Sequence, residues 1–220
     1  ERQAALAWRG PYMAVDEPQA VLSRLDALAG YRSQFELVFG EPASEDNVSA
    51  ALATYMRTLV STDTAWDRYR GGDEDALTEA QQRGWETFQR IGCYGCHAGA
   101  LLTDLQFHNV GIGIELAEPD VGRGKISLRN QDRGAFKTPT LRDIGKSAPY
   151  FHDGSVETLE EAVRMMMGKG LPALWMQQAS PQFRPVELDD DDFADLMAFL
   201  SALDQPEVEW ALPPELPPAR

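Results

Sequence analysis

Two cysteines and a histidine stand close together in the sequence, in the order Cys93-Tyr94-Gly95-Cys96-His97. Thiols three positions apart can add to the two vinyl groups of a haem, and the adjacent imidazole can bind its iron. The rivals are a thioredoxin-like pair, which needs a βαβ setting that the sequence lacks, and a zinc site, which needs two further ligands at suitable spacing. We therefore interpret Cys93 and Cys96 as covalent attachment sites for one haem c, and His97 as an axial ligand.

The second axial ligand decides what such a haem does. A methionine opposite the histidine suits electron transfer, whereas an open position suits reaction with peroxide. The sequence offers seven methionines in addition to His108 and His152. The run Met165-Met166-Met167 lies in a segment with helical periodicity, but from the residues alone the choice among methionines stays open. For His108 and His152 we expect hydrogen-bonded structural roles.

The elements that must position these residues are mainly helical. Capping patterns begin helices after Ser44, Thr78, Thr158 and Asp189, and each is followed by apolar residues at helical spacing. The helix after Thr78 leads directly into Cys93, and residues 98–150 form a Gly-, Asp- and Pro-rich stretch that is too long for an ordinary connection. We predict a mainly α, cytochrome c-like helical haem domain with long wrapping loops, and a short hairpin around residues 111–123.

The composition excludes several classes of function. With 20 Lys and Arg against 35 Asp and Glu, the net charge is 20 − 35 = −15. Such a charge disfavours nucleic acid and anionic lipid, and it favours a basic protein partner. No stretch reaches the ~18 consecutive apolar residues of a membrane-spanning helix. We expect a mature or trimmed soluble chain without a membrane span.

Several further motifs resemble the bacterial di-haem cytochrome c peroxidase family, which includes the di-haem enzyme that matures methylamine dehydrogenase. The resemblance runs from Gln3 to about Leu203. The segment that links the two haem domains of the family is similar to three stretches of this sequence, residues 57–61, 67–69 and 72–73. The segments that resemble its second, high-potential haem domain are residues 93–97, Asp104 and residues 107–111, 136–142 and 148–155.

The resemblance implies a set of site residues. It selects Met166 as the distal ligand, fourteen positions after His152, and the maturation enzyme is similar but has Tyr there. It places the pocket residues Phe136, Pro139, Leu141 and Arg142 around the haem. Arg142 is expected either to neutralise a propionate or to form an ion pair within the protein. Backbone carbonyls at Ser147 and Pro149 match ligands of the calcium ion of the family.

Two departures from the family pattern bear on activity. The family carries a first Cys-x-x-Cys-His motif in its N-terminal domain, and these 220 residues contain no second copy. Where the family has a catalytic Glu, this sequence has Met13. We expect residues 1–75 to be a helical remnant of the first domain and the interdomain link, 76–205 the haem domain, and 206–220 a Pro-rich tail; whether the chain is an enzyme stays open.

The functional expectation is a periplasmic electron-transfer domain. It would take electrons from a basic soluble donor, such as a small cytochrome c or a cupredoxin, towards peroxide reduction, with a homodimer as a further expectation from the family. One alternative is a di-haem oxidase or protein-modifying enzyme that uses a first haem outside this chain. The other is a non-catalytic haem-binding module.

Overall fold

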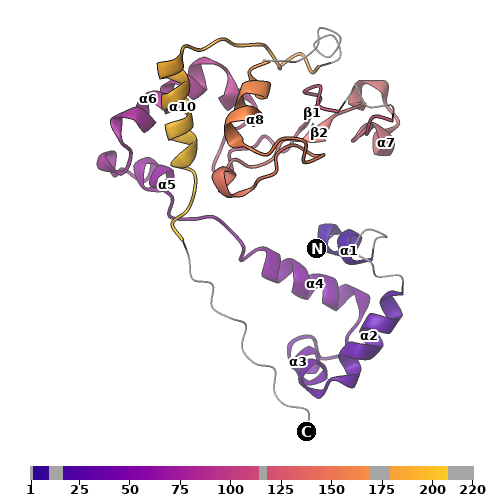
Figure 1. Cartoon of the computed structure of the whole chain (residues 1–220). Helices are drawn as coiled ribbons and strands as arrows, with labels where there is room; N and C mark the ends of the chain where they lie inside the picture. Colours follow the sequence, from indigo (N-terminus) through magenta and orange to yellow (C-terminus); the bar gives the residue numbers. More distant parts are fainter. Residues whose placement is uncertain (1, 10–16, 114–117, 169–178, 208–220) are drawn as a thin grey trace. The chain divides into compact units, whose positions relative to one another are not determined.

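A computed structural model describes residues 2–9, 17–113, 118–168 and 179–207. Within these residues helices dominate, and one pair of short strands accompanies them (Figure 1). The mainly α fold class is therefore confirmed. None of the described helices is long and apolar enough to cross a membrane.

The chain divides into two compact units between Val60 and Ser61. The sequence places this boundary later, after residue 75. The difference arises because the segment after Ser61 packs into the second unit. Its helix α5 (Ala65–Arg70) contributes Trp66 to that core, and the Trp66 N–H donates to the carbonyl of Ala202 at 3.1 Å. Most of the expected Pro-rich tail lies outside the described residues.

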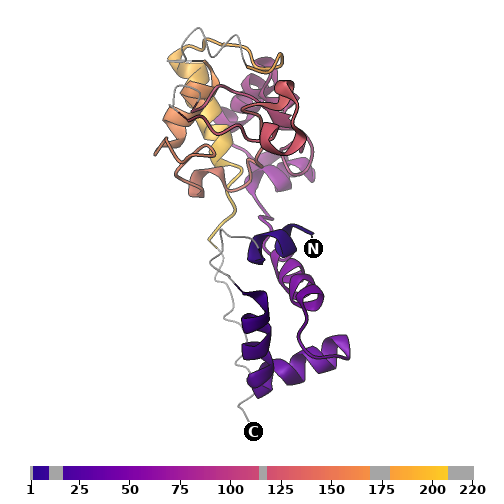
Figure 2. The same cartoon turned by 90° about the vertical axis from the view of Figure 1, so that its right-hand side faces the viewer.

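The first unit is built from helices that pack around a small apolar core (Figure 2). The described helices are α1 (Arg2–Trp8), α2 (Pro18–Ala27), α3 (Ala29–Phe39) and α4 (Glu45–Met56). The core residues are Trp8, Leu22, Phe35 and Val48. Trp8 also donates from Nε1 to Ser49 Oγ at 2.9 Å, which ties α1 to α4.

Helix α4 begins as predicted, at a capping box in which Ser44 and Asn47 exchange hydrogen bonds. In the sequence, apolar residues at helical spacing continue from Val48 through Leu52, Tyr55, Met56 and Leu59 to Val60, whereas the helix ends at Met56. Tyr55 and Met56 are 63% and 49% exposed. Only the N-terminal part of this stripe therefore contributes to the core of the first unit.

The second unit is organised by the crossing of α6 (Glu79–Arg90) and α10 (Asp190–Ser201). Gly84 makes the close approach possible, because a Cβ at this position would clash with the Asp195 carbonyl and lie 2.8 Å from Phe199 Cβ. Apolar side chains from both helices and their neighbours fill the core around the crossing. They are Trp66, Leu77, Phe88, Leu102, Leu196, Phe199, Leu200, Ala202 and Leu203.

The acidic run at the start of α10 caps that helix. Asp189 accepts a hydrogen bond from the backbone N–H of Asp192 at 2.8 Å, as predicted for a helix N-terminus. Asp192 also pairs with Arg90 of α6 at 2.5 Å, and Asp195 pairs with Arg83 at 2.6 Å. The run therefore starts one helix and helps fix it against the other.

The strand pair lies at a different place from the predicted hairpin. Strand β1 (Phe107–His108) pairs antiparallel with β2 (Phe136–Lys137), and His108 stands opposite Phe136. In the described residues between the strands the chain bends at glycines with positive φ and forms the short helix α7 (Gly124–Ser127). Within the described part of residues 111–123 no two segments pair with each other, and residues 114–117 of the predicted hairpin lie outside the described residues, so that hairpin stays a prediction.

Candidate haem-binding site

The two thiols sit at the turn that follows α6. Gly92 has φ 91°, and Cys93–Gly95 then form one turn of 3-10 helix, so the helix is broken where the motif begins. Neither thiol is in a disulfide. Burial raises the pKa of Cys93 to about 11, and burial followed by the charge of Asp104 raises the pKa of Cys96. Both thiols therefore stay protonated at neutral pH.

His97 is oriented by the backbone of the loop that follows it. Its Nδ1 lies 3.1 Å from the carbonyl oxygen of Leu102, and because a carbonyl only accepts, Nδ1 carries the proton. Burial lowers the pKa of His97 more than this hydrogen bond raises it. The imidazole is therefore neutral at pH 7 and keeps the lone pair of Nε2 for a metal.

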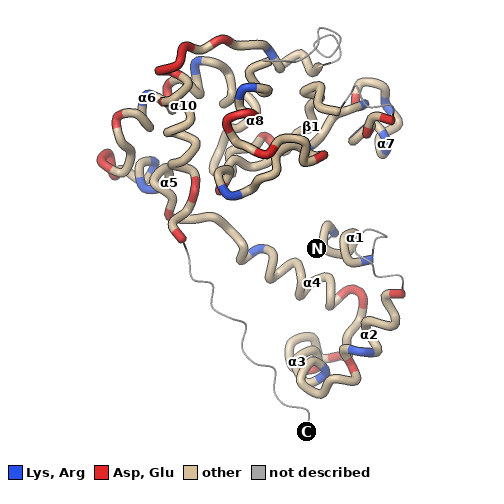
Figure 3. Tube along the Cα trace, in the orientation of Figure 1, with Lys and Arg blue, Asp and Glu red and all other residues tan. Residues whose placement is uncertain are grey.

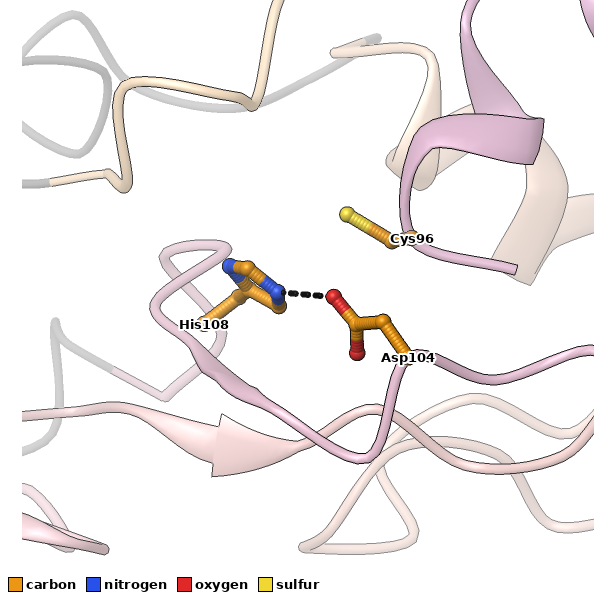
Figure 4. Close-up of side chains that lie close together, drawn as sticks. All are labelled: Cys96, Asp104 and His108. Atoms are coloured by element: carbon orange, nitrogen blue, oxygen red, sulfur yellow. Dashed lines mark hydrogen bonds and ion pairs between the residues drawn. The ribbon is translucent and has the colours of Figure 1, made fainter. Parts of the chain in front are cut away.

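His108 and Asp104 form a pair next to Cys96 (Figure 4). His108 Nε2 lies 2.7 Å from Asp104 Oδ2, and the ligand atoms of all three residues lie within 4.8 Å of one another. The hydrogen-bonded role expected for His108 is confirmed. The grouping of these three residues could not be predicted from the sequence. It depends on the pairing of β1 and on the course of the loop before it, and residue spacing reveals neither. A zinc ion there would need Cys96 as a thiolate, so it would compete with haem attachment.

The three consecutive methionines have different environments at the end of α8 (Leu159–Met166). Met167 is 5% exposed, and Met165 packs against the buried cluster that contains Tyr150 and Val156. Met166 is 37% exposed. Of the three side chains, Met166 is thus the one that the core does not enclose.

The structure places the predicted pocket residues in different settings. Phe136 stacks on His152, with ring centroids 3.6 Å apart and planes 13° apart. Leu141 packs against the main core, and Pro139 is exposed. Phe136 and Pro139 thus have exposed surface that a haem could contact, whereas Leu141 also packs against the core of the second unit.

Arg142 takes the second of its two expected roles. It pairs with Asp67 and donates from Nε to the Ala100 carbonyl at 2.8 Å and from Nη1 to the Ser61 carbonyl at 3.0 Å. Asp67 was missed as its partner, although its position in the capping box of α5 marked it as ordered. The predicted calcium positions Ser147 and Pro149 are both exposed, and calcium there stays a prediction.

The donor set fits a haem c. Two protonated, partly buried thiols stand next to a neutral imidazole whose Nδ1 is occupied, and Met166 provides a thioether that is not enclosed by the core. Cys93 and Cys96 would hold the haem covalently, and His97 and Met166 would be the candidates for its iron. The Met13 position, where the family has Glu, lies outside the described residues.

Comparisons with known proteins identify the family of this chain. The family model for di-haem cytochrome c peroxidase matches residues 1–75, and the model for cytochrome c matches residues 81–204. The methylamine utilization protein MauG of Methylorubrum extorquens is 38% identical over 216 residues, which cover 93% of this chain and 59% of that protein. Cytochrome c551 peroxidase of Nitrosomonas europaea is 33% identical over 194 residues, which cover 86% of this chain and 53% of that protein.

A comparison with solved structures also finds a relative of this family. A MauG-like protein associated with microbial copper homeostasis matches with a TM-score of 0.79 and 30% identity, and the match covers 93% of this chain and 68% of that one. The chain spans little more than half the length of the two curated relatives described above. The protein thus belongs to the di-haem cytochrome c peroxidase family, and residues 81–204 are its cytochrome c domain.

Proposed function

We propose that this chain carries one haem c and passes electrons from a soluble donor towards peroxide reduction. Cys93 and Cys96 hold the haem, and His97 and Met166 bind the iron. The observation that carries the proposal is the contrast among the methionines, since Met166 at 37% exposure is available whereas Met167 is buried. A haem with His and Met ligands exchanges single electrons, and this ligation raises its potential.

The surrounding residues keep the ligands in place. The Leu102 carbonyl holds the proton of His97 at Nδ1, so Nε2 keeps a fixed direction. Leu102 itself is 1% exposed and belongs to the core, which fixes the position of its carbonyl. Arg142 binds the Ala100 carbonyl in the same loop. The loop after the thiols is therefore held from two sides.

The donor is proposed to be a basic soluble protein, such as a small cytochrome c or a cupredoxin. The net charge of −15 attracts a Lys-rich face at long range and accelerates encounter. The proposed compartment is the periplasm, where haem is attached covalently to proteins of this kind. A homodimer and a calcium ion bound through the carbonyls of Ser147 and Pro149 complete the proposal.

The second candidate is an enzyme of the maturation type, which uses a first haem outside these residues to oxidise another substrate. The observation in its favour is the 38% identity to MauG over 93% of this chain. Met166 favours the first candidate, because the maturation enzyme is similar but has Tyr at the matching position. A non-catalytic haem-binding module is the third candidate, and it predicts an axial position that opens easily.

A stopped-flow experiment tests the proposed function. The haem-loaded chain is mixed with a reduced, Lys-rich cytochrome c, and the rate of electron transfer is followed as salt is raised. We expect the rate to fall severalfold between low and physiological ionic strength, since screening weakens the attraction. A small neutral reductant is the control and should show little salt dependence. A salt-independent rate with the cytochrome, or rapid carbon monoxide binding by the reduced haem, would contradict the proposal.

A further inference from the structure

Residues 121–134 form a small closed lobe, here called the basic lobe. A bridge between Gly122 and Ala135 closes it at the base, and the Arg123 N–H donates to the Ala135 carbonyl at 2.8 Å. The Gly134 N–H donates to the Val121 carbonyl at 3.1 Å. These backbone contacts fix the lobe, so a partner that binds it loses little entropy in ordering it.

The basic lobe exposes two large apolar side chains. Ile126 is 74% exposed and Leu128 is 87% exposed, and Leu128 is the most exposed large apolar side chain in the described residues. They lie two positions apart, at the end of α7 and at its C-cap. Single exposed apolar residues are common, but two on one ordered turn resemble the centre of a binding surface.

Leu128 is a poor choice for stability. It has φ 58° and lies in the left-handed region at the C-cap of α7, a position that glycine or asparagine occupies at lower cost. Burial of the Leu128 side chain does not offset the free-energy cost of this backbone conformation, because the side chain is exposed to solvent rather than packed in the core. The identity of residue 128 is therefore better explained by a contact outside the chain.

The charge of the basic lobe is opposite to that of the protein. Residues 121–134 contain four basic residues and one acidic residue, 4 − 1 = +3, in a chain of net charge −15. Arg129 is paired with Asp132 at 2.9 Å, and within the described residues Lys125 and Arg133 make no ion pair. Figure 3 shows Lys and Arg positions around α7, interspersed with acidic ones. The lobe is therefore an apolar turn with unpaired positive charge beside it.

We propose that the basic lobe is a docking surface for a soluble protein whose contact face is acidic around an apolar centre. Ile126 and Leu128 would supply the apolar contact, and Lys125 and Arg133 would pair with carboxylates of the partner. Such a partner differs from the basic electron donor, because the two charges are opposite. The proposal rests on the lobe alone and does not depend on the haem.

The position of the lobe connects it to the candidate site. The Arg123 guanidinium lies over the ring of Phe107, 4.6 Å from its centroid. Phe107 begins β1, whose next residue His108 pairs with Asp104 beside Cys96. The basic lobe therefore contacts β1, the strand that carries His108.

The test uses the full haem-loaded chain and a fluorescent peptide in which a pair of leucines is flanked by glutamates. The reference peptide has lysine in place of each glutamate, and binding is measured by fluorescence anisotropy. We expect the acidic peptide to bind at least tenfold more tightly than the basic one, and to weaken as salt rises. Leu128→Asn should lower the affinity at least tenfold without lowering the melting temperature, since asparagine tolerates the left-handed region.

Two further variants make the test specific. Lys125→Glu should weaken binding of the acidic peptide and strengthen binding of the basic one. Leu37→Asn, which removes a 78% exposed leucine from α3, should change neither affinity. The proposal is overturned if the acidic peptide does not bind, or if Leu128→Asn leaves its affinity unchanged. Preferential binding of the lobe to phosphatidylglycerol vesicles or to a second copy of the chain would also overturn it.

Discussion

Arg142 and Asp67 form a two-pronged ion pair, with Nη2 to Oδ1 at 2.7 Å and Nη1 to Oδ2 at 2.8 Å. The Arg142 side chain is 13% exposed and that of Asp67 is 30% exposed. The same guanidinium also holds the carbonyls of Ser61 and Ala100. One side chain thus joins the start of the second unit, helix α5 and the loop that follows His97.

Arg142→Met should destabilise the second unit, because it leaves the Asp67 carboxylate and two carbonyls without their donor. The expected loss in the free energy of unfolding is about 2 kcal/mol, measured by urea denaturation. Arg83→Met is the matched control, because Arg83 pairs with Asp195 in a two-pronged way but is 57% exposed. Its loss should be small. Equal losses for the two variants would contradict the structural role of Arg142.

The Asp67 pair should make stability depend on pH in the acid range. Hydrogen bonds from Arg142 lower the pKa of Asp67 from 3.8 to about 2, more than burial raises it. Because the folded pKa lies below the unfolded one, the stabilisation is present above about pH 4 and is lost as pH falls towards 2. Urea denaturation of wild type and Arg142→Met across this range should show their difference shrinking below pH 4. A difference that stays constant down to pH 2 would exclude this ion pair as its source.

Met166→Ala should abolish the weak sulfur-to-iron charge-transfer band of the oxidised protein, because the thioether ligand is removed. Met167→Leu is the control, since Met167 is 5% exposed and leucine of similar volume can replace it in the core. This variant should keep the band, and thermal melting should show that both variants fold. If Met167→Leu loses the band and Met166→Ala retains it, the assignment of Met166 is wrong.

Gly84→Ala should weaken the crossing of α6 and α10. The added Cβ would clash with the Asp195 carbonyl and with Phe199, so the helices must move apart. We expect a loss of about 3 kcal/mol in chemical denaturation. Gly95→Ala adds a Cβ in open space without requiring a left-handed backbone, and it should cost far less. A tolerated Gly84→Ala would mean that the crossing is looser than described.

Local patterns in the sequence predicted the helices well. Ser44, Thr78, Thr158 and Asp189 all cap the helices they were expected to begin, because capping depends on residues three positions apart. Contacts between distant residues were not predictable in this way. The strand pairing of residues 107–108 with 136–137 and the Arg142–Asp67 pair depend on how long loops close, and spacing carries no information about that.

The candidate site was predictable to a similar extent. The adjacency of Cys93, Cys96 and His97 in the sequence was enough to suggest haem attachment. The choice of Met166 needed the family resemblance, since helical periodicity places Met166 and Met167 on one face and only burial separates them. The predicted boundary after residue 75 agrees with the ends of the two family-model matches, residues 1–75 and 81–204. The compact units divide earlier, at Val60, because Trp66 packs in the core of the second unit.

Intact mass spectrometry of the denatured protein tests the central claim most directly. A chain made in cells that attach haem covalently should exceed its polypeptide mass by one haem, and the excess should persist after acidic acetone extraction. The variant with both Cys93→Ala and Cys96→Ala should lose this excess. A wild-type mass equal to the polypeptide alone, or one that exceeds it by two haems, would contradict the account of a single haem held by these two cysteines.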